Sequence, residues 1–287
     1  CEGLVGVSAQ AIVEETLKNL YDGVKESDLA TTMVMCARVH IEQEPNYTYV
    51  TSRLLLDQLR SEALGFLDIT DKASPADMVE FYPQALPIYL KRGVELELLS
   101  PDLLKYDLAK IADAIEPVRD LQFTYLGLQT LYDRYFLHSN DVRFELPQLF
   151  FMRVAMGLAM NEADREARAI EFYQLLSSFD YMASTPTLFN AGTLRPQLSS
   201  CYLTTIPDDL YGIYDGIRDN AMLSKWAGGL GNDWTPVRAL GAYIKGTNGK
   251  SQGVVPFLKV ANDTAVAVNQ GGKRKGAVCA YLESWHL

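Results

Sequence analysis

The sequence predicts an α/β protein in which a helical part is followed by a part where strands and helices alternate. Over most of the first 182 residues, apolar side chains recur at steps of three and four, the period of an amphipathic helix. After Met182 glycine becomes frequent, and short β-prone runs are separated by helical patterns. Such alternation is typical of a parallel sheet covered by helices. A boundary between the two parts is expected near Tyr181.

Start and stop signals divide the first part into helices. Ser8 is placed to cap one helix and Gly23 to end it, while Pro45 ends a second helix that opens at Ser27. The same period predicts further helices over residues 50–67, 78–92, 101–116, 147–160 and 162–182. Residues 123–137 carry aromatic and apolar side chains at near-alternate steps, which favours a strand there.

The second part contains predicted elements of both kinds. Strands are expected over residues 201–205, 237–244 and 277–282, and helices over residues 215–226 and 255–268. Residues 184–193 have Pro186 near their start and Asn190 and Gly192 near their end, a composition that predicts a stable loop with a tight return.

Composition bounds the class of protein. A net charge of -10 opposes a nucleic-acid-binding surface, because binding to phosphate backbones depends on Lys and Arg. No apolar run approaches the roughly 20 residues that a membrane helix needs, and no signal peptide is recognisable. We therefore expect a soluble, cytoplasmic protein with neither nucleic-acid nor membrane partners. Because the chain begins at Cys1 and stops after an apolar, strand-like run, it is also expected to be a fragment of a longer polypeptide.

The cysteines predict reduced thiols and no metal site. Cys1, Cys36, Cys201 and Cys279 form no C-x-x-C pair and have no histidine at ligand spacing. Cys36 falls on an apolar helical stripe and is expected in the core. Cys201 differs, because it follows Ser199 and Ser200 at the start of a predicted strand, where a thiol is accessible. A buried structural cysteine is the alternative for this position.

Three glycine-containing segments differ in what their patterns allow. Residues 227–231 are rich in glycine and follow a predicted helix. Their backbone amides could approach an anion, or the glycines could simply end the helix. Residues 247–251 look like the end of a P-loop, but Ile244 stands where that motif requires its first glycine. Residues 269–276 combine two glycines with three cations, a composition that allows more than one backbone conformation.

Taken in order, Ser184–Thr193, Leu198–Cys201 and Asn269–Gly276 resemble the large subunit of class I ribonucleoside-diphosphate reductase. The resemblance implies that residues 1–23 are the remnant of an ATP-cone-like region and that residues 24–181 form the helical domain. It further implies that residues 182–287 are the first part of a ten-stranded α/β barrel. The implied reaction replaces the ribose 2′-hydroxyl with hydrogen, starting from a cysteine radical.

The resemblance also implies site residues. Cys201 matches one of the two cysteines that are oxidised to a disulfide as the substrate is reduced. The positions matched to substrate binding are Thr185, Ser200, Cys201, Gly229, Gln270 and Arg274, with Lys275 as an alternative to Arg274. A deoxynucleoside triphosphate or ATP effector is implied at a dimer interface. Its matched residues are Asp208 or the neighbouring Asp209, Lys225, Arg238, Lys245 and Gly246 in or near the loop 242–246.

Several partners follow from the same resemblance. They are a ribonucleoside diphosphate, a complementary C-terminal part of the large subunit with the radical cysteine, a metal-containing small subunit that generates the radical, thioredoxin or glutaredoxin, and a second large subunit in a homodimer. This chain itself is expected to hold no metal or cofactor. Two alternatives remain: a non-catalytic nucleotide-binding and dimerisation fragment of a split reductase, and part of a cobalamin-dependent reductase.

Overall fold

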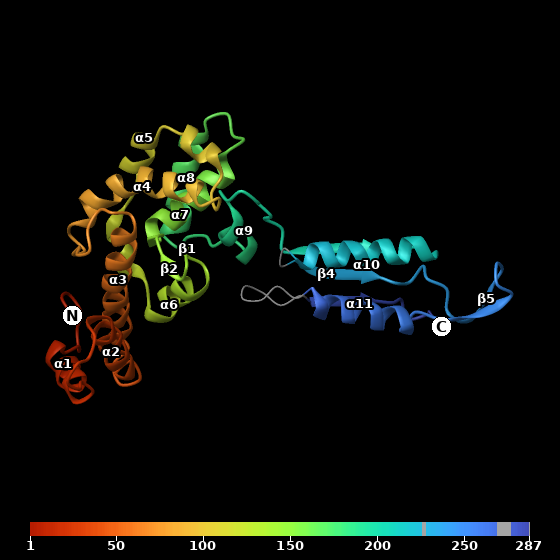
Figure 1. Cartoon of the computed structure of the whole chain (residues 1–287), viewed down its shortest axis with the longest axis horizontal. Helices are drawn as coiled ribbons and strands as arrows, with labels where there is room; N and C mark the ends of the chain where they lie inside the picture. Colours follow the sequence, from red (N-terminus) through yellow and green to blue (C-terminus); the bar gives the residue numbers. More distant parts are fainter. Residues whose placement is uncertain (226–227, 269–276, 287) are drawn as a thin grey trace. The chain divides into compact units, whose positions relative to one another are not determined.

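The computed structural model describes residues 1–225, 228–268 and 277–286. The chain divides into two compact units (Figure 1). The first unit contains Cys1–Ala183 and Leu188–Pro196, and the second contains Ser184–Thr187 and Gln197–Leu287. The chain therefore passes from one unit to the other inside the segment 184–196.

The first unit is helical. Its α-helices are α1 Ala9–Lys18, α2 Glu26–Val39, α3 Tyr47–Phe66, α4 Met78–Glu95, α5 Leu108–Asp113, α6 Tyr125–Arg134, α7 Pro147–Ala159 and α8 Arg165–Ser177. Two 3₁₀ turns, η1 Pro101–Lys105 and η2 Pro117–Gln122, and a short hairpin of β1 His138–Ser139 and β2 Val142–Arg143 complete the unit. Ser8 caps α1 as predicted, because its Oγ accepts a hydrogen bond from the N–H of Ala11 at 3.2 Å.

Several predictions for this unit are wrong. Helix α1 ends at Lys18, with Asn19 as its C-cap, before the predicted end at Gly23, and helix α2 ends at Val39, before Pro45. Residues 123–137 hold helix α6 instead of a strand, because Tyr125 and Leu128 are buried three residues apart while Leu126 is exposed. The predicted helix over residues 101–116 is broken near Tyr106. Its hydroxyl donates to the carbonyl of Met156, and the next residue, Asp107, caps the new helix α5.

Helix α7 lies at the centre of the helical core. All of its residues from Pro147 to Met156 are buried, and Phe150 and Phe151 make edge-to-face and stacked contacts with the surrounding aromatic rings. Three polar side chains within or just before this helix, Glu145, Gln148 and Arg153, are also fully buried. Each has hydrogen-bond partners from other elements, as buried polar groups require.

The second unit contains a parallel sheet. Its elements are β3 Cys201–Thr205, α10 Leu210–Ser224, β4 Gly229–Asp233, β5 Leu240–Ile244, β6 Gly249–Gln252, α11 Val255–Ala267 and β7 Ala277–Tyr281. The strand order is β3-β4-β7, all parallel, and Cys201, Gly229 and Ala277 are aligned across it. Strands β5 and β6 form a separate antiparallel hairpin. The predicted α/β class, a helical part followed by a part with a parallel sheet and covering helices, is thereby confirmed.

The two faces of this sheet differ. Helices α10 and α11 pack on one face, over a core of Ile206, Ile213, Ile217, Trp234, Val237, Val254 and Ala261. Asn232 of β4 exchanges two hydrogen bonds with Asn220 of α10, at 2.7 and 3.1 Å, and both side chains are buried. Residues of the opposite alternation, among them Cys201 and Leu203 on β3 and Tyr281 on β7, are exposed. This exposed face is available for chemistry.

Local interactions shift three predicted boundaries. The predicted loop over residues 184–193 contains a short helix, α9 Thr185–Asn190, whose second residue is Pro186, where a missing N–H costs nothing. The tight return is confirmed at Gly192, whose φ is +77°. Helix α10 starts at Leu210 because Asp209 caps it. Strand β5 starts at Leu240 because the N–H of Val237 turns back to Trp234.

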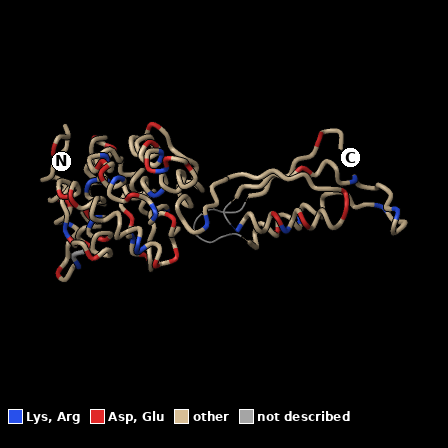
Figure 2. Tube along the Cα trace, turned by 90° about the horizontal axis from the view of Figure 1, so that it is seen from above, with Lys and Arg blue, Asp and Glu red and all other residues tan. Residues whose placement is uncertain are grey.

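Charges of both signs are interspersed along the helices of each unit (Figure 2). Several form ion pairs one helical turn apart, such as Lys18 with Glu15 and Arg168 with Glu171. Such exposed pairs contribute only about 0–1 kcal/mol each. The net charge of -10 is consequently spread over the surface, and a local anion site is compatible with it.

Candidate functional site

A thiol site lies at the amino-terminal edge of the parallel sheet. Cys201 opens β3 with its side chain exposed, and the Oγ of Ser200 donates a hydrogen bond to its Sγ at 3.7 Å. The N–H of Gly229, the first residue of β4, donates to the carbonyl of Ser200 at 2.7 Å. A Cβ added to Gly229 would lie 3.7 Å from the sulfur. Glycine therefore leaves bare backbone beside an accessible thiol.

Hydroxyl groups of α9 lie beside the segment that leads to this thiol. The Oγ1 of Thr187 donates to the carbonyl of Leu198 at 3.2 Å, and the hydroxyl of Ser184 lies 3.2 Å from the Oγ1 of Thr187. Thr185 belongs to the same short segment of the second unit. The structure thus brings Ser200, Cys201 and Gly229 together, and it places Thr187 beside the segment that leads to them. Gln270, Arg274 and Lys275 lie outside the described residues.

The exposed face carries a phenol that the sequence analysis missed. Tyr281 and Cys279 lie on the same face of the sheet as Cys201, because aligned residues of parallel strands share a face. A hydrogen bond with the Cys279 thiol, and the neighbouring thiols Cys279 and Cys201, raise the pKa of the Tyr281 hydroxyl. Because side chains of a strand alternate between its two faces, the predicted strand over residues 277–282 could have indicated that residues 277, 279 and 281 share one face.

A second site is a cavity of about 290 Å³ at the other end of the strands. Its lining residues are Asp208, Asp209, Leu210, Ile213, Val237, Arg238, Ile244, Ser251 and Phe257. Arg238 donates to the Asp208 carboxylate from its backbone N–H at 2.9 Å and from its Nε at 2.9 and 3.0 Å. Partial burial alone would raise the pKa of Asp208, but the hydrogen bonds and charge of Arg238 hold it below its usual value.

The two acidic candidates in this cavity have different local partners. Asp208 faces the cation Arg238, whereas the Oδ1 of Asp209 accepts the N–H of Gly212 at 2.8 Å as the cap of α10. Lys245 and Gly246 are exposed in the turn between β5 and β6, directly after the lining residue Ile244. The sequence-predicted effector residues 208, 209, 238, 245 and 246 are therefore grouped around or next to one cavity.

Lys225 is not brought to this cavity within one chain. It is the C-cap of α10, whereas Asp209 is the N-cap of the same helix. The 15 residues of α10 separate the two ends by about 22 Å at 1.5 Å per residue. Lys225 lies instead at the end of the sheet where Cys201 and Gly229 begin their strands.

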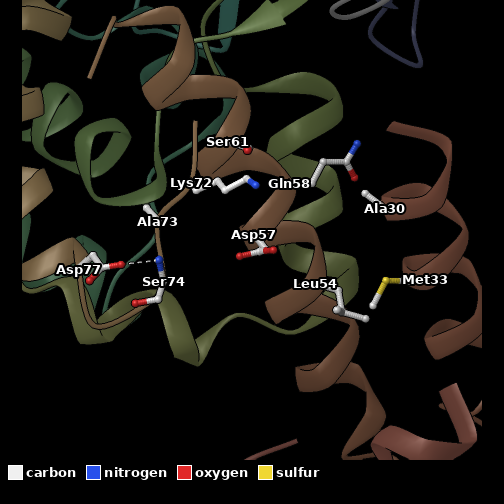
Figure 3. A pocket seen from close by; sticks show the side chains of 10 residues that line it. All are labelled: Ala30, Met33, Leu54, Asp57, Gln58, Ser61, Lys72, Ala73, Ser74 and Asp77. Carbon is white, nitrogen blue, oxygen red and sulfur yellow. Dashed lines mark hydrogen bonds between the residues drawn. The ribbon is translucent and has the colours of Figure 1, made fainter. Parts of the chain in front are cut away.

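The helical unit has a cavity of about 640 Å³ that contains none of the predicted site residues (Figure 3). It is lined by Ala30, Met33, Leu54, Asp57, Gln58, Ser61, Lys72, Ala73, Ser74 and Asp77. Its carboxylates already have partners. Asp57 pairs with the buried Arg60 at 3.1 Å, and Asp77 accepts the N–H of Ser74 at 2.8 Å.

Within residues 1–225, 228–268 and 277–286, no three or more His, Cys, Asp or Glu side chains gather as metal ligands would. Over the same residues, no helix has both the length and the apolar character needed to cross a bilayer.

Comparison with known proteins relates both units to one family. Residues 121–196 match the all-alpha domain of ribonucleotide reductase, and residues 199–287 match its barrel domain. The ribonucleoside-diphosphate reductase subunit alpha of Chlamydia trachomatis is 54% identical over 279 residues, which are 97% of this chain and 26% of that relative. The corresponding subunit of Helicobacter pylori is 41% identical, and the large subunit of Danio rerio is 37% identical.

Those two relatives are each aligned with 100% of this chain and over 35% of their own length. The chain therefore spans about a quarter to a third of the curated relatives that it matches. The similarity runs through both units and includes the segments 184–193 and 198–201 that first indicated the resemblance. The chain belongs to the ribonucleotide reductase large-subunit family.

Proposed function

We propose that this chain is part of the large subunit of a ribonucleoside-diphosphate reductase and supplies the first redox cysteine, part of the substrate site and the specificity-effector site. The observation that carries the proposal is the exposed Cys201 thiol, which has the Ser200 hydroxyl and the bare backbone of Gly229 beside it. Thr187 of α9 donates to the carbonyl of Leu198, three residues before this thiol. Hydroxyls suit a ribose or a phosphate because they both donate and accept hydrogen bonds.

In the proposed reaction, the bond between the ribose C2′ and its hydroxyl oxygen breaks, the oxygen leaves as water, and hydrogen takes its place. The two electrons come from two thiols, which are oxidised to a disulfide. Cys201 is one of these thiols. The second thiol and the thiyl radical that starts the reaction would come from large-subunit segments outside these 287 residues, together with a radical-generating small subunit. Thioredoxin or glutaredoxin would then reduce the disulfide by thiol exchange.

The cavity at Asp208 and Arg238 is the proposed effector site for a deoxynucleoside triphosphate or ATP. Arg238 offers a guanidinium to phosphate, and a nearby carboxylate suits ribose hydroxyls. Lys225 would reach the effector from a second copy of the chain, because two α10 helices packed antiparallel place the C-terminus of one beside the N-terminus of the other. Tyr211, Tyr214 and Met222 support this packing as exposed residues of α10.

The catalytic proposal predicts that Cys201→Ser abolishes multiple turnover in a complete large subunit that contains this sequence. A serine hydroxyl cannot form the disulfide, so each enzyme would stop without completing a cycle. Cys36→Ser is the matched control, because Cys36 is buried in the helical unit. The measurement is reduction of cytidine diphosphate with thioredoxin and the small subunit, without adenosylcobalamin. Equal turnover by the two variants would refute the role of Cys201.

The effector proposal predicts that Arg238→Ala weakens binding of dTTP about tenfold to a hundredfold, as expected for the loss of one charge-assisted contact worth roughly 1.5–3 kcal/mol. Arg168→Ala is the control, because Arg168 is an exposed arginine of α8 that pairs with Glu171 and does not line the cavity. Equilibrium binding to the dimeric protein measures both. If Arg238→Ala binds dTTP with unchanged affinity, the assignment of the effector site to this cavity is wrong.

A second candidate function is a nucleotide-binding and dimerisation module without catalysis of its own. It is favoured by one observation: the cavity at Asp208 and Arg238 is lined by described residues of this chain, whereas the proposed reaction needs a second thiol and a radical from elsewhere. The isolated chain is then expected to form no deoxycytidine diphosphate above background. If a complete large subunit with the small subunit is also inactive while dTTP binding persists, the module reading is preferred.

A further inference from the structure

The guanidinium of Arg153 on α7 is fully buried and binds the end of helix α9. Its Nη1 donates to the carbonyl of Ala191 at 2.7 Å, and its Nη2 donates to the carbonyl of Leu188 at 3.2 Å. Carbonyls at the C-terminal end of a helix have no partner within the helix. Arg153 therefore caps α9 from a residue 35 positions earlier in the chain.

Glu145 holds the guanidinium in this orientation. The Nε of Arg153 donates to its Oε1 at 2.7 Å, and both side chains are completely buried. The same carboxylate accepts the hydroxyl of Tyr89 and the N–H of Leu137. Burying an ion pair costs desolvation energy that apolar residues of similar volume would avoid. We therefore infer that this ion pair fixes the orientation of the Arg153 guanidinium more than it stabilises the fold.

The turn after α9 is held at the same place. A Cβ on Gly157 of α7 would lie 2.1 Å from the backbone nitrogen of Gly192, so the two backbones are in direct contact. The carbonyl of Gly192 accepts the N–H of Ser100 at 3.0 Å. The ring of Phe189 stacks on Tyr135 with centroids 4.4 Å apart. Every residue from Leu188 to Gly192 except Asn190 is buried.

We propose that Arg153 is a positioning residue for the substrate-side hydroxyls, a role that rests on the proposed reductase function. Helix α9 has six residues, too few to be stable alone, so its placement depends on its anchors. Arg153 binds the carbonyl of Leu188, one turn after Thr185. Thr187, the residue directly before Leu188, donates to the carbonyl of Leu198, three residues before Cys201. Arg153 thereby anchors the short helix that carries Thr185 and Thr187, without touching substrate.

The test compares Arg153→Lys with Arg60→Lys in the complete reductase. Lysine keeps the charge beside Glu145 but loses the planar fork that binds the two carbonyls. Arg60 is an equally apt control, because it is 2% exposed, pairs with Asp57 and donates to the carbonyl of Ala73, far along the chain from α9.

We expect Arg153→Lys to lower kcat/KM for the ribonucleoside diphosphate on the order of tenfold to a hundredfold, since small misplacements of positioning groups have effects of this size. Affinity for dTTP should stay unchanged, and hydrogen exchange of the amides of residues 187–191 should accelerate. Arg60→Lys should leave kcat/KM unaltered. Glu145→Gln, which keeps the shape of the pair, should change the same quantities less, and it serves as the test if Arg153→Lys does not fold.

Two further outcomes distinguish a failure of the role of Arg153 from a failure of the proposed substrate site. If Thr185→Ala and Ser200→Ala both leave kcat/KM unchanged in an active enzyme, the substrate site itself is wrong and the role of Arg153 falls with it. If those two variants lower kcat/KM but Arg153→Lys and Glu145→Gln alter only the melting temperature, the substrate site stands and Arg153 is merely structural.

Discussion

At the scale of single residues, the helical unit contains a buried carboxyl group with neutral partners. The carboxylate of Asp120 accepts the hydroxyl of Tyr82 at 2.7 Å and the side-chain amide of Gln148 at 2.8 Å, and the amide oxygen of Gln148 in turn accepts the hydroxyl of Tyr173. Burial raises the pKa of Asp120 to about 6, although the hydrogen bonds from Gln148 and Tyr82 and the charge of Arg60 act in the opposite direction.

This shift predicts a pH dependence of stability. Between about pH 4 and pH 6 the folded protein holds the Asp120 proton more tightly than the unfolded chain does, so the free energy of unfolding falls as pH rises. The slope from this group approaches about 1.4 kcal/mol per pH unit at most. Asp120→Asn should remove that part of the slope, measured by urea unfolding from pH 4 to pH 7. The exposed Asp113→Asn is the control, and identical slopes in both variants would contradict the prediction.

The residue pattern around Cys201 predicted an accessible thiol at a strand start, and its side chain is exposed. Its redox role comes from the resemblance and stays a prediction. Residue patterns were not sufficient to find Arg153 or Tyr281. The apolar run around Arg153 indicates a buried arginine, but its partners Leu188 and Ala191 come together with it only when α7 and α9 pack.

At the scale of elements, the contact between α7 and the turn after α9 depends on glycine. Gly157→Ala would force a methyl group against the backbone nitrogen of Gly192, where the ideal Cβ lies only 2.1 Å away. We expect a loss of about 3 kcal/mol in unfolding free energy, the upper end of the usual range for overpacking. Urea denaturation of the variant measures it.

Gly65→Ala is the matched control for this experiment. Gly65 is also a helical glycine, but a Cβ there meets nothing within 4 Å. Replacing it should stabilise the protein by roughly 0.5–1 kcal/mol, because alanine loses less conformational entropy in a helix. If both variants are equally stable, the close approach of α7 to Gly192 is not a constraint on the fold.

At the scale of the whole molecule, the two ends of α10 predict that the effector site needs two copies of the chain. Lys225→Ala and Arg238→Ala should each weaken dTTP binding in a homodimer. In a mixed dimer, one site would combine the intact Arg238 of the first variant with the intact Lys225 of the second. Mixing the two variants should therefore restore tight binding at one site per mixed dimer, measured by the stoichiometry of a dTTP titration. If tight dTTP binding does not recover after subunit exchange, the prediction is wrong. Lys225 and Arg238 would then either contribute to a site within one chain or lie outside the effector site.

The sequence by itself determined the fold class and the family. Helical periodicity marked the first unit, alternating strands and helices marked the parallel sheet, and the motifs around Thr185 and Cys201 indicated a reductase large subunit; all of these signals are local, carried by residues within a few positions of one another. The aromatic and apolar spacing over residues 123–137 led to a wrong strand prediction. Tyr125 and Leu128 are buried three residues apart, but the exposed Leu126 between them is also apolar, so the helical period looked like alternation.

Only the tertiary structure decided how the site residues are grouped and held. In the folded chain, Asp208 pairs with Arg238, 30 positions away, and Lys225 lies at the end of α10 opposite to Asp209. Helix α9 is capped by Arg153, an arginine of another helix. Such contacts join residues far apart in the chain, and a buried charge is stable only where the packed fold supplies its partners. A local pattern contains no record of those partners, so the capping of α9 by Arg153 becomes visible only once the helices are packed.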